Sequence, residues 1–235
     1  MRLVVIQSNY IPWRGYFDLL SKADAFVVYD SVQYTKNDWR NRNKLVNSSG
    51  ASWLTIPVET AGRFGQTIYS ATVADGRWAA KHWRTASQML GRCPYFDMFE
   101  AEWHLEYQKS SSKRSLSEIN VGFIRLIAHQ LGAATEIVLD EEIGNLVGSP
   151  TERLVLLSQR LGATSYLTGP AALSYLELDR FRESNVAVDV IDYSLYRAYP
   201  QRSSTFEPAV SILDLLANVG PEAMSYLDAP VRRLS

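Results

Sequence analysis

The stretch MRLVVIQSNYIPWRGYFDLLSKADAFVVYD, residues 1–30, decides the fold of this chain. A β-branched run at residues 2–7 is interrupted by a turn that contains Pro12, and apolar residues then recur at helical spacing as far as Ala23. A second apolar run, AFVVY at residues 25–29, lacks polar alternation, which is typical of a strand covered on both faces. Strand, helix and strand in this order predict a right-handed parallel βαβ unit.

The same alternation of strands and helices continues along the chain. Further strands are expected at residues 52–58, 136–139, 166–167 and 186–191, and further helices at 151–161 and 171–181. Residues 76–131 have helical periodicity, and the last helix there opens with a capping box formed by Ser115 and Glu118. We therefore expect an α/β fold with an open, mainly parallel Rossmann-like sheet, in a single domain at 1–235 with a helical insertion at about 76–131.

Composition excludes several classes of protein. The chain has 24 basic and 25 acidic residues, so its overall charge does not attract nucleic acid, and any anion must be bound by a local patch. The single cysteine, Cys93, excludes an internal disulfide, and no histidine has the spacing of a metal ligand, so no metal site is expected. No apolar run approaches the roughly 20 residues that cross a bilayer, and the first residues lack the pattern of a signal peptide, so we expect a cytoplasmic protein without membrane contact.

Residues 28–44, VYDSVQYTKNDWRNRNK, run from a strand into a loop rich in cations, amides and aromatic rings. Guanidinium groups bind phosphate and carboxylate through two parallel hydrogen bonds, and amides add neutral donors. The pattern predicts an anion-binding loop. The alternative is a solvated charged loop, although such loops favour Gly, Ser and Glu over Trp and Tyr. The residues expected to bind are Gln33, Lys36, Asn37, Trp39, Arg40 and Arg42.

Other polar residues stand where the expected strands end. Ligands of open α/β sheets lie outside the carboxyl ends of the strands, and Gln7, Asn9, Asp30 and Thr168 all follow strands. Gln7 and Asn9 precede a helix N-terminus, which favours anions, but they could equally form the turn. Asp30 could act as a general base or cap the following turn. Arg14 is a cation in the first helical turn, where it opposes the helix dipole, so we expect it to face a partner.

Three further candidates have strong structural alternatives. His104 could be a general base if the helical part folds over the edge of the sheet, or else a partly buried surface histidine. Arg153 follows an N-cap at Ser149 and could still reach a ligand. Gln201 follows a cluster of tyrosines of the kind that binds sugars or bases, and we expect Gln201 to bind substrate, although the cluster could instead pack the C-terminal tail.

Several motifs follow one another in order over nearly the whole length of the chain. They are QSNYIPWRGYFDLL from residue 7, YDSVQYTKNDWRNRNK from 29, WLTIPV from 53, SPTERL from 149, LTGPAALSYL from 167 and FEPAVSILDLLANVGPEA from 206. In these motifs the chain resembles the WbqC-like family, whose members are encoded in gene clusters for polysaccharide, O-antigen and natural-product synthesis. The resemblance therefore implies a biosynthetic role, but no specific reaction, because the family has no settled general activity.

A more distant resemblance is to the HIGH-signature nucleotidylyl transferases, which share the order of strand, turn with Pro, short motif, helix, strand and polar loop. In those enzymes a His-x-Gly-His element stabilises the triphosphate. The corresponding residues here are Trp13, Arg14, Gly15 and Tyr16, so the glycine is kept and both imidazoles are absent. Each lost donor would lower the rate by about a hundredfold or more. The resemblance therefore implies an inherited nucleotide scaffold rather than adenylyl transfer from ATP by the usual route.

Two functions remain open at this point. The first is a transferase that moves an acyl or aminoacyl group to an amino-sugar or amino-acid-derived substrate in surface-polysaccharide or natural-product biosynthesis. Lys36, Arg40 and Arg42 would bind its anionic group, and Asp30 or His104 would move the proton.

The second function is a protein that binds a nucleotide or the end of a tRNA on a degenerate nucleotidylyl transferase scaffold, either without catalysis or with different chemistry. Both readings expect a small anionic or nucleotide-linked ligand. The sequence carries no signal for a resident cofactor. The donor of the transferred group could instead be a nucleotide, another phosphate-bearing molecule, or a group bound to tRNA or to another carrier. The sequence also does not indicate an oligomeric state.

Overall fold

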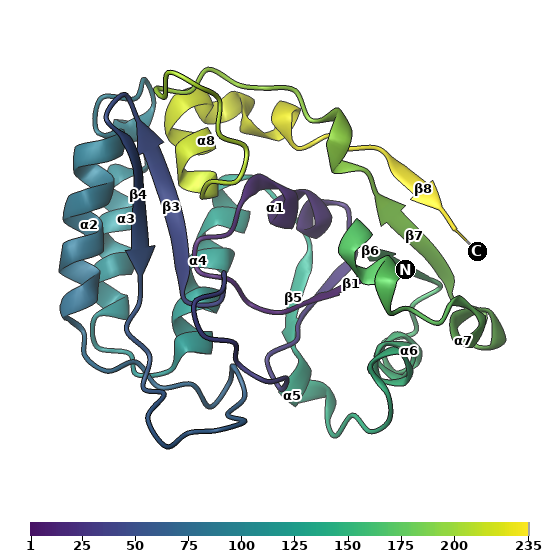
Figure 1. Ribbon diagram of the computed structural model, residues 1–235. Coiled ribbons are helices and arrows are strands. Elements are labelled where there is room, and N and C mark those ends of the chain that lie inside the picture. The colour runs from purple at the N-terminus through teal and green to yellow at the C-terminus, as the bar shows by residue number, and fades with distance from the viewer. Residues whose placement is uncertain (235) are drawn as a thin grey trace.

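Six strands form one sheet in the computed structural model, which describes residues 1–234. The strand order is β5-β2-β1-β6-β7-β8, and every neighbouring pair is parallel except β7 and β8. The winding therefore reverses between β1 and β6, as it does in Rossmann folds. The expected α/β class and mainly parallel Rossmann-like sheet are thus confirmed (Figure 1). The strands are β1 (Arg2–Ile6), β2 (Ala25–Val28), β5 (Glu136–Leu139), β6 (Ser165–Thr168), β7 (Ala187–Ile191) and β8 (Val231–Arg233).

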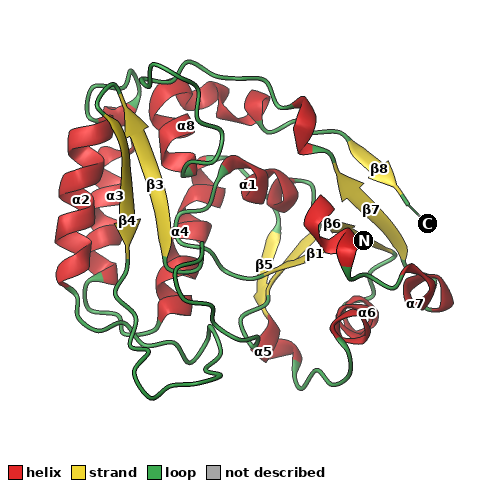
Figure 2. Cartoon of the chain, in the orientation of Figure 1, coloured by secondary structure: helices red, strands yellow, loops and turns green. Residues whose placement is uncertain are grey.

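Helices pack against both faces of this sheet (Figure 2). Val4 of β1 belongs to a buried cluster with residues of α1 and α4, whereas the next residue, Val5, packs on the other side with residues of α6 and α7. Burial on both faces explains why β1 and β2 read as continuous apolar runs. The helices are α1 (Arg14–Ser21), α2 (Arg77–Leu90), α3 (Phe96–Ser110), α4 (Leu116–Gln130), α5 (Asp140–Ile143), α6 (Pro150–Arg160), α7 (Leu178–Glu183) and α8 (Ile212–Val219), with 3-10 helices η1 (Pro170–Ser174), η2 (Tyr193–Leu195) and η3 (Gly220–Tyr226).

A strand is present in the region expected at 52–58, but it begins and ends earlier and is not part of the main sheet. β3 (Arg42–Asn47) and β4 (Gly50–Thr55) form a separate antiparallel hairpin, which lies beside α2 in Figure 1. The end of the expected polar loop is therefore a strand. Its residues alternate, with Asn43 and Leu45 buried while Arg42 and Lys44 are half-exposed. Because the inward-facing side chain of Asn43 is polar, the sequence of β3 lacks the alternation of apolar and polar residues that identifies a strand.

Two more local differences concern the second half of the chain. The helix expected at 171–181 is divided into η1 and α7, with residues 175–177 outside both. The antiparallel edge strand β8 was not expected, because its three residues are too short to show a periodicity.

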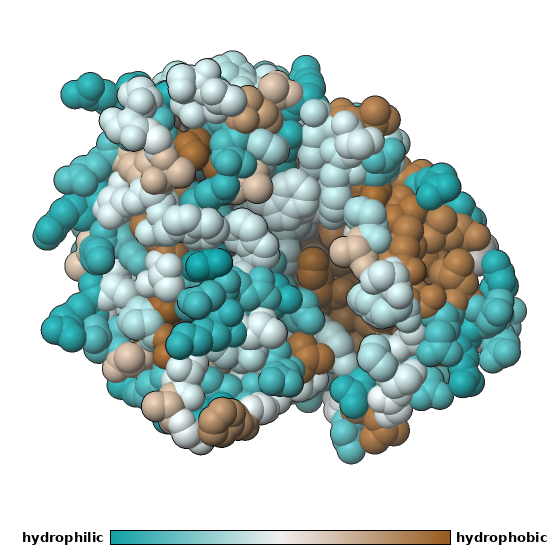
Figure 3. Space-filling view, viewed as in Figure 1, coloured by the Kyte–Doolittle hydropathy of each residue, from teal (hydrophilic) through white to brown (hydrophobic). Residues whose placement is uncertain are grey.

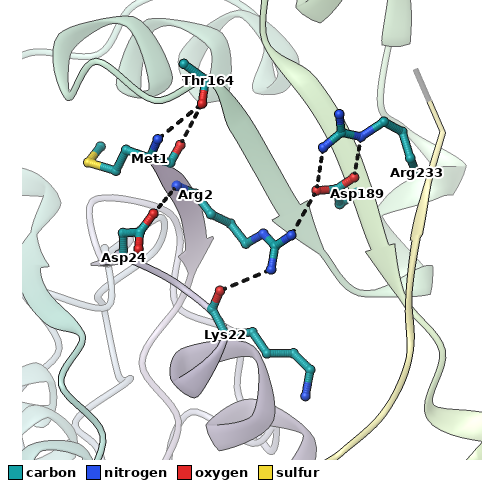
Figure 4. Close-up of polar contacts among 7 residues, drawn as sticks. All are labelled: Met1, Arg2, Lys22, Asp24, Thr164, Asp189 and Arg233. Carbon is teal, nitrogen blue, oxygen red and sulfur yellow. Dashed lines mark hydrogen bonds and ion pairs between the residues drawn. The ribbon is translucent and has the colours of Figure 1, made fainter.

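Charged contacts at the amino end of β1 hold this edge strand in place. The buried carboxylate of Asp189 on β7 accepts hydrogen bonds from Arg233 on β8, at 2.9 Å from Nε and 3.3 Å from Nη2. Arg2 forms an ion pair with the same carboxylate at 3.6 Å (Figure 4). This cluster lies at the opposite end of β1 from Gln7, so it supports the sheet without approaching the strand ends discussed below.

Three consecutive helices, α2 to α4, occupy the region that the periodicity marks as helical. Ser115 is the N-cap of α4, and its side chain accepts a hydrogen bond from the backbone N–H of Glu118 at 3.2 Å. Within residues 1–234, none of the helices combines the length and the apolar character that a membrane span requires.

Candidate functional site

A cavity of about 790 Å³ opens where β1 and β6 end. Consecutive residues of both strands line it, Val4 to Gln7 on one side and Tyr166 to Thr168 on the other, followed by the first residues of η1. Figure 3 shows the molecule hollowed near the centre of the same face, with apolar atoms in its depth. This is the place where open α/β sheets bind ligands, because the strand order reverses there. We call it the switch cavity.

A second, smaller hollow of about 280 Å³ lies next to it. Trp13 lines both hollows, so they share a wall. Trp39 and the amide side chains of Asn9 and Asn43 complete most of the second hollow, together with Pro12 and Ala209. We call it the tryptophan slot. Indole walls with amide groups beside them suit a flat ring that carries polar substituents, such as a nucleobase or a sugar face.

The guanidinium of Arg40 joins the two hollows. Its Nη2 donates to the side-chain oxygen of Gln7 at 2.7 Å, and its Nη1 donates to the side-chain oxygen of Asn9 at 2.5 Å. Gln7 lines the switch cavity and Asn9 lines the tryptophan slot. Because both amide oxygens accept from Arg40, both amide NH₂ groups are turned away from it and are able to donate to a ligand. The positive charge behind each amide polarises it further, so both hollows offer strong donors to an oxygen atom.

A strained turn after β1 sets this arrangement. Ile11 has φ of 38°, a conformation that is rare for a β-branched residue and costs about 1–3 kcal/mol. Nδ2 of Asn43 donates to the carbonyl oxygens of Tyr10 at 3.1 Å and Ile11 at 2.9 Å, and the N–H of Tyr10 donates to the carbonyl of Trp39 at 3.0 Å. The β3–β4 hairpin, through Asn43, and the polar loop, through Trp39, therefore hold this turn in place. The turn then positions Trp13 between the two hollows.

A buried polar cluster ties this turn to β2 and α4. The carboxylate of Asp30 accepts from the backbone N–H of Ser8 at 2.8 Å and from the hydroxyl of Ser117 at 2.6 Å. Asn120 donates to the hydroxyl of Ser8 at 3.0 Å and to the carbonyl of Arg40 at 2.9 Å. Burial raises the pKa of Asp30, and the hydrogen bonds from the two serines oppose that rise. Since both carboxylate oxygens are engaged, the geometry makes Asp30 a support for the turn.

The walls of the switch cavity are mainly apolar, with polar groups at a few points. The Arg153 side chain interacts with the hydroxyl of Tyr29. Burial raises the pKa of this hydroxyl, and the hydrogen bond and positive charge of Arg153 oppose that rise. Oγ1 of Thr168 accepts a hydrogen bond from the Tyr166 hydroxyl at 3.4 Å. The cavity therefore suits a ligand with an apolar part and a small number of hydrogen-bonding atoms.

A sequence model of the WbqC-like protein family matches residues 7–226, which include Gln7, Asn9, Arg40 and the rest of the site except the cavity-lining residues of β1. The chain belongs to the WbqC-like protein family. It is also similar to the uncharacterised protein Rv1507c of Mycobacterium tuberculosis (strain ATCC 25618 / H37Rv), with 42% identity over 226 residues, 96% of this chain and 97% of that protein. No solved structure matches this WbqC-like chain significantly.

The structure brings several of the sequence candidates together. Gln7 and Thr168 line the switch cavity, Asn9 and Trp39 line the tryptophan slot, and Arg40 bridges them. Arg153, for which the sequence left a ligand contact open, also lies in the wall of the switch cavity. The inward-facing Arg40 is thus the part of the polar loop that meets the strand ends.

Other loop residues lie apart from the two hollows. Lys36 and Gln33 are exposed, and Asn37 has a left-handed backbone with φ of 59°, which Asn tolerates well in turns. Arg42 projects from β3, and its guanidinium lies 4.6 Å from the ring centre of Trp53. These side chains face solvent or the hairpin surface in the WbqC-like fold.

Arg14 is buried and faces the C-terminal part of the chain. Its Nη1 donates to the carbonyl of Arg197 at 2.8 Å, and its guanidinium lies 4.2 Å from the ring centre of Tyr196, with Tyr199 and Phe206 also nearby. Burial lowers its pKa. Arg14, expected from the sequence to bind substrate, thus contacts the C-terminal segment, and it is not among the residues that line the two hollows.

Gln201 and His104 also lie elsewhere. Gln201 donates to Asp214 at 2.7 Å and accepts from the backbone of Glu207 at 2.8 Å, so both ends of its amide fix the C-terminal loop. His104 stacks on Trp83 at 4.8 Å, in a groove between α2 and α3, whereas other residues of the described chain line the two hollows.

Sequence reasoning missed two tryptophans of the site region. Trp13 directly follows the proline of the turn after β1, so its position at a strand end was a usable signal. Trp53 lies in the hairpin, and its neighbours Arg42 and Trp39 become visible only through the β3–β4 pairing.

Proposed function

We propose that this WbqC-like protein is a transferase that moves an acyl or aminoacyl group to the amine of a small anionic or nucleotide-linked substrate, such as an amino sugar. The observation that carries the proposal is the contact of Arg40 with both Gln7 and Asn9, between two adjoining hollows. Two reactants need two places that meet at one point, and the polarised amides lie at that point.

The chemistry of acyl transfer fits these donors. The amine nitrogen bonds to the carbonyl carbon, the bond from that carbon to its carrier breaks, and the amine proton leaves with the carrier group. Negative charge builds on the carbonyl oxygen during this step. The NH₂ groups of Gln7 and Asn9, backed by Arg40, are suited to stabilise that charge, and loss of one such donor typically lowers kcat by about 100- to 1000-fold. Asp30 holds the turn that presents them.

The two hollows suit different parts of the reactants. The tryptophan slot has two indole walls and fits the base or sugar of a nucleotide-linked amine. The switch cavity has apolar walls and fits the acyl or aminoacyl group. A role in surface-polysaccharide or natural-product biosynthesis follows from the kind of substrate, an activated amino sugar or amino acid derivative.

A transfer assay tests this proposal. The purified protein is incubated with acyl-coenzyme A or aminoacyl-tRNA donors and nucleotide-linked amino sugars, and products are detected by mass spectrometry. Arg40→Met should lower the rate by about a hundredfold or more, because the amides lose their orientation and their positive charge. Arg182→Met, which removes an exposed arginine on α7, should leave the rate unchanged. No product from any pair of donor and acceptor, or an unaffected Arg40→Met variant, contradicts the proposal.

A second function, binding of a nucleotide or tRNA end without this chemistry, is favoured by the hairpin surface. Trp39 and Trp53 are 40% and 48% exposed, and their ring centres are 5.7 Å apart. Arg42 lies over the Trp53 ring, so cations and exposed rings alternate as they do in proteins that bind single-stranded nucleic acid.

Salt dependence distinguishes this second function. Binding of a tRNA end through several phosphates should lose about one log unit of affinity per phosphate contact for each tenfold rise in salt, and Trp53→Ala should weaken it by about tenfold or more. Affinity that is independent of salt, or an unaffected Trp53→Ala variant, excludes binding of nucleic acid at this surface.

A further inference from the structure

Gln7 and Tyr29 lie side by side on the face of the sheet that α6 covers. Each stands two positions after a residue of the buried cluster on that side, Val5 and Val27, and side chains two positions apart in a strand share a face. The N–H of Tyr29 donates to the carbonyl of Ile6 at 3.0 Å, so the β1–β2 ladder reaches these residues. Neighbouring strands are about 4.8 Å apart, which brings two polar side chains close together in the wall of the switch cavity.

Arg153 adds a cation to this part of the cavity. It lies on α6 and is half-buried, and its side chain interacts with the hydroxyl of Tyr29. Its Nε donates to the carbonyl of Gly148 at 2.9 Å, which leaves Nη1 and Nη2 for Tyr29 and for a ligand. Because an arginine can only donate, the Tyr29 hydroxyl accepts from it and keeps its own hydrogen free to donate. The guanidinium and the phenol together therefore offer strong donors to one anion.

The charge of Arg153 has no acidic partner in the part of the chain that the structure describes. Arg153 takes part in none of the ion pairs there, and the described residues that line the cavity include no carboxylate. The adjacent Glu152 is engaged elsewhere. One of its oxygens accepts from the backbone N–H of Ser149 at 2.8 Å, and the other lies 3.6 Å from Arg180.

The buried carboxylate of Asp140 also acts near this point. Burial and, to a smaller extent, the charge of Asp140 raise the pKa of Tyr29. The two oxygens of Asp140 accept from the backbone N–H groups of Asp30 at 3.0 Å and Ser31 at 3.2 Å, and Asp140 is not among the residues that line the cavity. Its charge thus stabilises the start of the polar loop, and the guanidinium of Arg153 remains available to a ligand.

The charge balance indicates which kind of ligand group suits this point. One cation beside apolar walls matches one negative charge, which a carboxylate carries. A phosphate monoester carries about −1.5 to −2 at neutral pH and would leave excess negative charge against those walls. An ammonium group would place a second positive charge beside Arg153. A carboxylate is therefore favoured over a phosphate and over an ammonium group.

We propose that Arg153 and Tyr29 bind a free carboxylate at the end of the acyl group that occupies the switch cavity. Because Gln7 and Tyr29 are on adjacent strands, about two methylene groups separate this carboxylate from the carbonyl beside Gln7, as in a succinyl group. The inference deepens the proposed function and rests on it for the identity of the ligand. It narrows the transferred group to the monoacyl group of a short dicarboxylic acid, and it disfavours an aminoacyl group with a charged amine.

An NMR titration with three matched amides tests the site without a nucleotide and without transfer. The amides are N-butylsuccinamate, N-butylbutanamide and the N-butylamide of β-alanine, which end in a carboxylate, a methyl group and an ammonium group at the same position. The succinamate should bind at least about tenfold more tightly than the butanamide, and the ammonium compound no more tightly than the butanamide. Equal affinities of the first two, no binding of the succinamate, or a preference for the ammonium compound overturns the proposal.

Variants of α6 locate the effect. Arg153→Met should lower the affinity for the succinamate to that for the butanamide, whereas Arg153→Lys keeps the charge and should retain part of the preference. Arg160→Met removes an exposed arginine from the last turn of the same helix and should leave all three affinities unchanged. A carboxylate preference that survives Arg153→Met, or that Arg160→Met abolishes as well, also overturns the proposal.

A transfer assay with succinyl-coenzyme A and butyryl-coenzyme A separates this inference from the proposed function. Transfer without any carboxylate preference in the titration removes the carboxylate site and leaves the transferase in place. Carboxylate preference that depends on Arg153, without transfer from either donor, leaves the site in place and removes this form of the transferase.

Discussion

Histidine 82 should make the stability of this protein sensitive to mild acid. His82 lies on α2, is 4% exposed, and its Nδ1 is 2.9 Å from the hydroxyl of Tyr10, which is itself 3.1 Å from the hydroxyl of Tyr107. Burial lowers the pKa of His82 to about 4. The network holds Tyr10, which directly follows Asn9, so protonation of His82 would also loosen the site.

The direction in which stability changes with pH follows from the linkage between protonation and folding. The folded-state pKa of about 4 is below the value of about 6.5 for an unfolded histidine, so the unfolded state takes up the proton first. The contribution of neutral His82 to the free energy of unfolding is complete above pH ~6.5 and is lost as pH falls toward ~4. The whole difference corresponds to about 3 kcal/mol, of which about 2 kcal/mol is lost by pH ~5.

Urea unfolding between pH ~4 and ~7.5 measures this loss. Burial raises the pKa of Asp30 and of Asp214, which stabilises the fold toward acid, so the wild type has to be compared with His82→Gln at every pH. The difference between the two curves should shrink by about 2 kcal/mol from pH ~7 to ~5. His129→Gln, at an exposed histidine, is the control and should run parallel to the wild type. A His82→Gln curve that also stays parallel refutes the reasoning.

Three further predictions concern the supports of the site and of the sheet. Asn43→Ala leaves two carbonyls of the strained turn without their donor and should lower the free energy of unfolding by about 2–3 kcal/mol. Gly15→Ala places a methyl group where the Trp13 ring lies, so it should cost about 1–3 kcal/mol and weaken binding of a nucleotide-linked sugar in the slot. Asp189→Ala removes the acceptor of Arg233 and should cost about 2 kcal/mol. Urea denaturation measures all three, and a loss below about 0.5 kcal/mol contradicts the contact concerned.

The sheet was predictable because its signals are local. Residues 3–6 and 25–29 are apolar throughout, since both faces of β1 and β2 are covered, and such runs identify central parallel strands. The β3–β4 hairpin was not predictable in the same way. Asn43 faces inward because it holds the turn after β1, and that reason lies about thirty residues away in the sequence.

The site was predictable to the extent that a parallel sheet fixes where strands end. Gln7 and Asn9 follow β1, and Thr168 ends its neighbour β6 at the switch point, so their grouping could be expected. The direction in which each cationic side chain points could not be predicted, because it depends on tertiary packing. Arg40 turns inward to the amides while Arg14, on a helix facing the same region, is enclosed by rings from the C-terminal segment.

A crystal structure with a bound nucleotide-linked amino sugar, such as UDP-glucosamine, tests the central claim most directly. The account predicts that the ring system lies between Trp13 and Trp39, and that oxygen atoms of the ligand lie within hydrogen-bond distance of Nδ2 of Asn9 or Nε2 of Gln7. Ligand bound instead in the groove between α2 and α3 beside His104, with both hollows empty of it, would contradict the account.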